Sequence, residues 1–243
     1  MGRGRSQTLP AVSADELHRF FDDKVAGVRS STTNAPKPSF STAPSHCSMS
    51  DFRSLVEDDV ITAVRALPDK QCASDPLPTR LLKDSADILA PFLVELFNRS
   101  LSLGVVPTLF KAAYITPLLK KPDMNPAEAK SYRPISNLSV LSKLLERLVA
   151  HQLLDYLNSS RLMPDLQSAY RANHSTETAI LKVLGDILQA VDKGDLALLT
   201  LLDLSAAFDT VDHDTLLRRL HVSYGPIGYV HGWFISKCRY DPY

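Results

Sequence analysis

The stretch Leu196-Ala197-Leu198-Leu199-Thr200-Leu201-Leu202 decides the fold class, and Asp203 follows it directly. An almost unbroken apolar run of this length is typical of a central β-strand that is buried on both faces. A carboxylate at the end of such a strand is costly to bury unless something compensates its charge. Asp203 is therefore either a ligand of a divalent ion such as Mg²⁺, which prefers hard oxygen ligands, or a turn or helix-cap residue.

Around this stretch, apolar residues recur at helical spacing in most of the chain. The expected helices cover about residues 14–25, 55–67, 86–103, 141–157 and 176–192, and a last one begins near 212–214. The apolar face of the 176–192 helix is expected to point into the core. Two short segments, 112–119 and 132–138, have the composition of strands, and Pro117 and Pro134 make them edge strands. This order predicts a helix-rich α+β fold.

The overall charge excludes a uniformly basic nucleic-acid-binding protein. Lysine plus arginine and aspartate plus glutamate number 27 each, so the net charge is zero and any basic surface has to be local. Residues 111–151 hold seven lysines or arginines against three acids. This stretch is the candidate for contact with a nucleic-acid backbone, although such an excess is also typical of a solvated face.

The composition divides the chain near residue 50. Twelve of the twenty residues from Ser31 to Ser50 are Ser, Thr or Pro. We therefore expect residues 1–50 to be a flexible segment with one short helix, and residues 51–243 to be globular. The three cysteines are far apart, and no apolar leader or long apolar run occurs. These features predict an intracellular protein of the nucleus or cytoplasm without a membrane segment.

The string from Leu201 to His213 resembles the first catalytic palm motif of reverse transcriptases from non-LTR (LINE-type, CR1/L2-like) retrotransposons. Further stretches resemble the same family in the same order, although Ala169 stands where the family usually has glycine. They are 75–79, 117–122, 132–138, 142–146, 167–171 and 174–178. The resemblance covers roughly residues 52–234. It implies that residues 51–243 form a partial reverse transcriptase domain, with an N-terminal extension, the fingers and the start of the palm of a right-hand polymerase.

The resemblance also implies roles for single residues. Asp203, with the backbone carbonyl of Leu204, matches the position that holds the catalytic Mg²⁺ ions. Phe208 matches the steric gate that packs under the deoxyribose and excludes a 2′-hydroxyl group, with core packing as its alternative. Arg133 and Lys143 match basic positions of the fingers that bind the incoming triphosphate, and each could instead be a solvated surface charge.

Two further positions stay open between two roles. Gln167 and Arg171 match positions that face the template or support the nucleotide pocket, but a capping or surface role fits them equally well.

Two-metal phosphoryl transfer needs carboxylates from more than one element. Reverse transcriptases supply the others from a Tyr-X-Asp-Asp hairpin, and the 243 residues contain no such motif. We therefore expect the chain to be the first part of an RNA-directed DNA polymerase, which uses an RNA template, a DNA primer and dNTPs when intact and is inactive alone. The alternative is a non-catalytic remnant that binds RNA or a protein partner.

Overall fold

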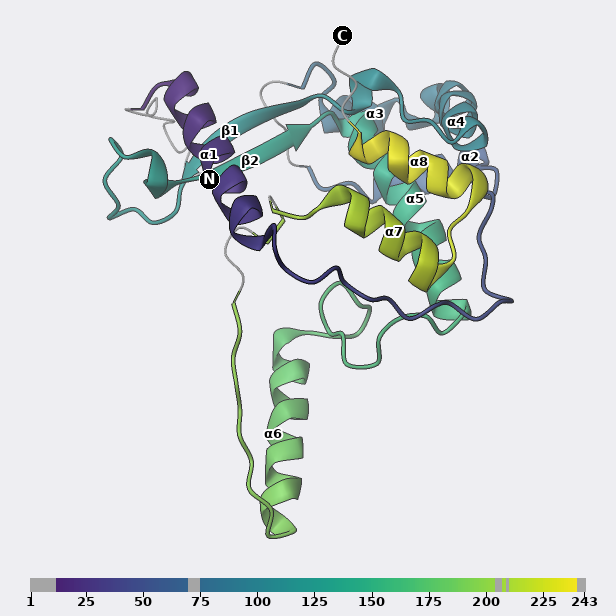
Figure 1. Cartoon of the computed structure of the whole chain (residues 1–243). Helices are drawn as coiled ribbons and strands as arrows, with labels where there is room; N and C mark the ends of the chain where they lie inside the picture. Colours follow the sequence, from purple (N-terminus) through teal and green to yellow (C-terminus); the bar gives the residue numbers. More distant parts are fainter. Residues whose placement is uncertain (1–11, 70–74, 204–206, 209, 240–243) are drawn as a thin grey trace.

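The computed structural model describes residues 12–69, 75–203, 207–208 and 210–239. Helices dominate this part of the chain, and a single pair of strands interrupts them (Figure 1). The elements are α1 (Ala14–Thr32), α2 (Glu57–Arg65), α3 (Thr79–Asp84), α4 (Ala86–Leu103), β1 (Ala113–Leu119), β2 (Tyr132–Leu138), α5 (Val140–Ser159), α6 (Thr176–Asp192), α7 (His213–Tyr224) and α8 (Gly228–Cys238). The prediction of a helix-rich α+β fold is therefore confirmed.

The two strands form an antiparallel hairpin in which Pro117 lies opposite Pro134. Because the sheet has only these two strands, each of them has a free edge, and neither proline has to donate a hydrogen bond on that side. Side chains alternate between the two faces of the hairpin. One face packs under α1, where Leu17 and Tyr132 are buried against each other, and the opposite face carries Tyr114 and Asn137.

The main core lies among α2, α4, α5 and α8. Val60, Phe97 and Leu144 are completely buried there, and each such side chain contributes about 2 kcal/mol of transfer free energy. Trp233 of α8 is buried as well, and its indole nitrogen donates a hydrogen bond to the Ser100 hydroxyl at 3.2 Å. Because α5 belongs to this core and follows β2 directly, the core also anchors one end of the hairpin.

The helices begin where the sequence places polar caps. The side chains of Ser13, Ser139, Ser175 and Asp212 each accept a hydrogen bond from a backbone N–H of the first turn of α1, α5, α6 and α7. The predicted helix starts are therefore confirmed to within a residue or two. None of the described helices combines the length and the apolar character that crossing a membrane requires.

The prediction of a buried central strand is wrong for this structure. Residues 196–202 are extended but belong to no strand, and the side chains of Leu198 and Leu202 are 93% and 90% exposed. A central strand needs a neighbour on each side, and no described strand pairs with this segment. The preceding helix α6 projects away from the other helices (Figure 1), and no residue of α6 is buried. The side of α6 that was expected to face the core is therefore exposed.

The segment between α1 and α2 has no helix or strand longer than a single bridge, as its composition predicts. Several contacts nevertheless tie this segment to α7. The Ala43 amide donates to the Val222 carbonyl at 2.8 Å, and the Arg218 guanidinium lies over the Phe40 ring at 5.0 Å. Helix α1 is also longer than the short helix expected, because it continues to Thr32. The flexibility of this segment stays a prediction.

Candidate nucleic-acid interface

The basic stretch, residues 111–151, forms the β1–β2 hairpin, its connecting loop and the first half of α5. The base of the loop is held closed, because the Lys120 amide donates to the Ser131 carbonyl at 2.9 Å and the Lys120 ammonium donates to the Lys130 carbonyl at 2.6 Å. Tyr132 is buried at the start of β2, and its hydroxyl donates to the Pro126 carbonyl at 2.8 Å. These bonds give the loop a defined shape on the rim of the hairpin.

The cations of this region fall into two groups. Lys130 pairs with Glu128 at 2.7 Å, and this hydrogen bond is the main cause that lowers the pKa of Glu128 and raises the pKa of Lys130. Lys237 of α8 pairs with Glu146 of α5. Within the described ranges, the basic side chains of the stretch that form neither an ion pair nor a hydrogen bond are Lys121, Arg133 and Lys143. These three positive charges are available to an external anion.

Arg133 and Lys143 lie on either side of the end of β2. Arg133 is exposed and faces Leu118 across the ladder. Lys143 is exposed in the first turn of α5, which Ser139 caps by accepting a hydrogen bond from the Ser142 amide at 3.2 Å. The five residue steps from Arg133 to the end of β2 span about 17 Å. The structure therefore places the two cations on different elements, Arg133 near the start of β2 and Lys143 in the first turn of α5.

Asp203 and Phe208 follow the exposed apolar segment. The Asp203 side chain is exposed, and Phe208 is 78% exposed, so neither the buried carboxylate nor the packed ring that the sequence indicates is formed here. Leu204, whose carbonyl is the second predicted ligand, lies outside the described residues. Across the described ranges, no group of three or more His, Cys, Asp or Glu side chains could hold a metal ion. These residues therefore do not complete a Mg²⁺ site by themselves.

Gln167 and Arg171 lie in the loop between α5 and α6, and their side chains donate hydrogen bonds to carbonyl groups of the same loop. The Gln167 amide donates to the Ala169 carbonyl at 3.1 Å, and the Arg171 guanidinium donates to the carbonyls of Pro164 and Asp165 at 3.1 and 3.2 Å. Tyr170 between them adopts a left-handed backbone with φ of 58°. These contacts bind both side chains within the local loop.

Sequence reasoning missed the contact that anchors the start of α5. Asp75 accepts a hydrogen bond from the Val140 amide at 2.6 Å through Oδ2 and one from the Leu77 amide at 3.2 Å through Oδ1. The local half of this arrangement has a signal, since Asp before Pro is typical of turns. The other half joins residues 65 positions apart, and no local pattern encodes it.

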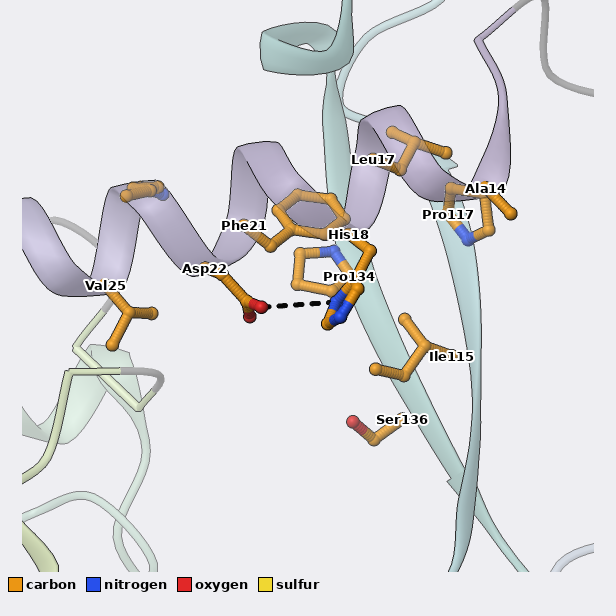
Figure 2. Close-up of a pocket in the computed structure, with 11 residues that line it drawn as sticks. Ala14, Leu17, His18, Phe21, Asp22, Val25, Ile115, Pro117, Pro134 and Ser136 are labelled. Carbon is orange, nitrogen blue, oxygen red and sulfur yellow. Dashed lines mark ion pairs between the residues drawn. The ribbon is translucent and has the colours of Figure 1, made fainter.

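A hollow lies on each face of the hairpin. The groove under α1 has a volume of about 540 Å³ and is lined by Phe21 and Val25 on the helix and by Ile115 and Ser136 on the strands (Figure 2). The opposite face borders a cavity of about 380 Å³ that includes Asp75. Only the second cavity combines an apolar lining with the start of α5, where Lys143 lies.

Comparison with known proteins adds a family to this geometry. The model of the family described as reverse transcriptase (RNA-dependent DNA polymerase) matches residues 119–241, about half of the chain. This match begins at the end of β1 and includes β2, α5, Asp203 and α7.

Several curated proteins of Drosophila are similar to the chain. A probable RNA-directed DNA polymerase from transposon BS of Drosophila melanogaster is 34% identical over 164 residues, which are 67% of this chain and 18% of that protein. The RNA-directed DNA polymerases from mobile element jockey are 31% identical in D. melanogaster and 35% in D. funebris, over 67% and 63% of this chain and 18% and 16% of their own length. The chain thus spans less than a fifth of the length of these relatives.

Proposed function

The chain belongs to the reverse transcriptase (RNA-dependent DNA polymerase) family, and we propose that residues 51–243 supply the fingers and the first part of the palm to RNA-templated DNA synthesis in a non-LTR retrotransposon. The observation that carries this proposal is the family match over residues 119–241, which includes the second strand of the basic hairpin and Asp203. The relatives compared above are RNA-directed DNA polymerases, which does not favour a remnant that only binds RNA or a protein partner.

We assign the catalytic role to Asp203. Its carboxylate is proposed as one ligand of a divalent ion, Mg²⁺ by the preference of that ion for hard oxygen ligands, with the Leu204 carbonyl beside it. Phe208, five residues further on, is proposed as the gate that excludes a 2′-hydroxyl group. Its exposed ring is consistent with a surface that nucleotide or further polypeptide covers.

We assign phosphate binding to the unpaired cations of the hairpin region. Arg133 and Lys143 are proposed to bind phosphate groups of the incoming nucleotide, and Lys121 extends the same positive surface along the loop. A guanidinium group and an ammonium group both suit phosphate oxygens. Gln167 and Arg171 are proposed as supports of the template path, because the bonds of Arg171 within its loop fit a positioning role. The partners in this proposal are an RNA template, a DNA primer and dNTPs.

Binding of single-stranded RNA tests the interface directly. We expect a triple variant to bind a 20-nucleotide RNA about tenfold or more weakly than the unsubstituted 243-residue chain. Its substitutions are Lys121→Glu, Arg133→Glu and Lys143→Glu. They should also reduce the slope of log K against log salt by about 2, since each lost phosphate contact on a single strand removes about 0.7. Filter binding between 50 and 200 mM salt measures both quantities.

A matched control separates the interface from overall charge. The control substitutions are Lys37→Glu, Arg99→Glu and Lys193→Glu, which change the net charge equally at exposed positions outside the hairpin and the hollows on its two faces. We expect this control to retain most of the affinity and the slope. An equal loss in both triple variants would contradict the assignment of the interface to the hairpin.

A further inference from the structure

Two histidines meet where α7 and α8 pack against each other, and none of the roles above uses them. The rings of His221 in α7 and His231 in α8 have centroids 5.1 Å apart, with an angle of 36° between their planes. His231 is half-buried, and His221 is exposed. The pair therefore lies at the edge of the contact between the two helices, next to solvent.

Backbone carbonyl groups fix the tautomer of each neutral ring. The Nδ1 atom of His221 lies 3.1 Å from the Pro226 carbonyl oxygen, and the Nε2 atom of His231 lies 3.2 Å from the Leu217 carbonyl oxygen. Because a carbonyl oxygen only accepts hydrogen bonds, each of these nitrogens carries the proton and donates it. In the neutral rings, Nε2 of His221 and Nδ1 of His231 then keep their lone pairs. These two atoms are the nitrogens that a metal ion can bind.

The two accepting carbonyl groups belong to well-fixed parts of the backbone. Pro226 is completely buried, and the next residue, Ile227, donates its amide to the Met49 carbonyl at 2.9 Å. Leu217 is buried one helical turn before His221. Histidines that bind metals almost always donate their other N–H to such an acceptor, which sets the orientation of the ring and makes the ligand more basic. Both rings therefore have the hydrogen bonds that a metal-binding histidine needs.

The distance between the rings fits a shared ion. With Zn–N bonds of about 2.0–2.1 Å and tetrahedral angles, two imidazoles that bind one zinc ion have ring centres about 5 Å apart. The observed separation of 5.1 Å agrees with this value. Ordinary packing of two aromatic rings allows the same distance. The fixed tautomers, together with the distance, are what indicate an ion.

The donor atoms also select the kind of ion. Imidazole nitrogen suits Zn²⁺, Cu²⁺ and Ni²⁺, whereas Mg²⁺ prefers the oxygen of carboxylates, carbonyls and water. Among the residues that the structure describes, no third His, Cys, Asp or Glu joins the pair to form a metal-binding group. Water would therefore fill the remaining positions, and we expect an affinity on the order of micromolar, weaker than that of a structural site with four protein ligands.

We propose that His221 Nε2 and His231 Nδ1 bind one Zn²⁺ ion, which links α7 to α8. The proposal does not depend on the polymerase assignment, because neither histidine has a role in it. Trp233 joins α8 to the main core, so a bound ion would also fasten α7 to that core. An ion that binds only the folded chain stabilises it.

Titration with ZnCl₂ tests the site on the 243-residue chain. At a hundredfold excess of free Zn²⁺ over its dissociation constant, the midpoint of thermal unfolding should rise by about 5 °C or more, and the same concentration of Mg²⁺ should not raise it. His221→Ala and His231→Ala should each weaken zinc binding, measured by calorimetry, about tenfold or more. His151→Ala, at an exposed histidine of α5, is the matched control and should retain the affinity.

Nitrogen-15 NMR of the imidazole groups gives a readout that does not depend on stability. Without metal, the spectrum should show the Nδ1–H tautomer for His221 and the Nε2–H tautomer for His231. Zn²⁺ should shift the resonances of the two nitrogens without protons, His221 Nε2 and His231 Nδ1. This measurement uses the unsubstituted chain, so it decides the question even when an alanine variant does not fold.

Several results would overturn the zinc site. They are zinc binding that survives in both alanine variants, an equal loss of affinity in His151→Ala, and zinc-induced shifts at other imidazole nitrogens only. A loss in only one of the two variants would also overturn it, because it would show a single imidazole ligand instead of a shared ion. Failure of RNA binding or of primer extension would leave the zinc site standing.

Discussion

Gly104 shows how one residue fixes the packing of two helices. It ends α4 in a left-handed conformation with φ of 64°, and a Cβ atom there would lie 2.7 Å from the carbonyl oxygen of Tyr229. Both the backbone conformation and the close approach of α8 therefore require glycine. Because the clash is with backbone, no side-chain movement relieves it.

We expect Gly104→Ala to lower the free energy of unfolding by about 2–3 kcal/mol, from left-handed strain plus displacement of α8. Urea unfolding followed by circular dichroism measures the change. Gly185→Ala is the matched control, because a Cβ at this position of α6 meets no atom within 4 Å, and its stability should be unchanged or slightly higher. Equal stability of Gly104→Ala and the unsubstituted chain would contradict the described α4–α8 contact.

The carboxylate of Asp212 stabilises the start of α7. It caps α7 by accepting a hydrogen bond from the Thr215 amide at 2.7 Å, and hydrogen bonding to Thr215 is the main cause that lowers the pKa of this carboxyl below its usual 3.8. A carboxyl whose pKa is lower in the folded state stabilises the fold at pH values above its unfolded pKa. This contribution is lost as the pH falls through the folded value.

Two substitutions separate the cap from its charge. At pH 7 we expect Asp212→Ala to lower the free energy of unfolding by about 1 kcal/mol, whereas Asp212→Asn retains the cap. Between pH 5 and pH 2, Asp212→Asn should lose less stability than the unsubstituted chain, because asparagine does not titrate. Urea unfolding across this pH range provides the measurement, and identical pH profiles for the two proteins would count against the cap.

At the scale of elements, the main feature is that no other described element covers α6 or residues 196–202. The helix has no buried residue, and the leucines after it are exposed, so both expose an apolar surface that a folded core normally covers. The apolar pattern correctly predicts the helix α6 but wrongly predicts a buried strand at residues 196–202. It does not say which other element covers them, and no described strand does so.

Two leucine-to-alanine substitutions compare the stabilising effect of a buried side chain in α5 with that of an exposed one in residues 196–202. Leu144→Ala removes a completely buried side chain of α5 and should lower the free energy of unfolding by about 2–5 kcal/mol. Leu198→Ala, at a side chain that is 93% exposed, should change it by less than about 0.5 kcal/mol. A cost for Leu198→Ala that approaches that of Leu144→Ala would show that residues 196–202 are buried in solution.

At the scale of the whole molecule, the success of sequence reasoning follows the range of each interaction. The start of α7 at Asp212 and the two strand segments lie within a few residues of their signals, and the sequence predicts them. The bond from Asp75 to Val140 and the exposure of Leu198 depend on distant partners, and no local pattern reveals them. The same holds for the candidate site, because the sequence motifs propose Asp203 and Arg133 as candidates but do not determine their relative positions.

The most direct test of the polymerase assignment replaces the matching segment of the jockey polymerase from D. melanogaster with residues 119–241 and measures primer extension on an RNA template with Mg²⁺. The chimera should extend the primer, and Asp203→Asn should lower the rate by more than about 100-fold, since it removes the proposed metal ligand while preserving shape. Asp195→Asn, at an exposed acid before the apolar run, should leave the rate unchanged. Phe208→Val should retain extension and relax discrimination against ribonucleotides. An Asp203→Asn chimera as active as its parent would contradict the catalytic assignment.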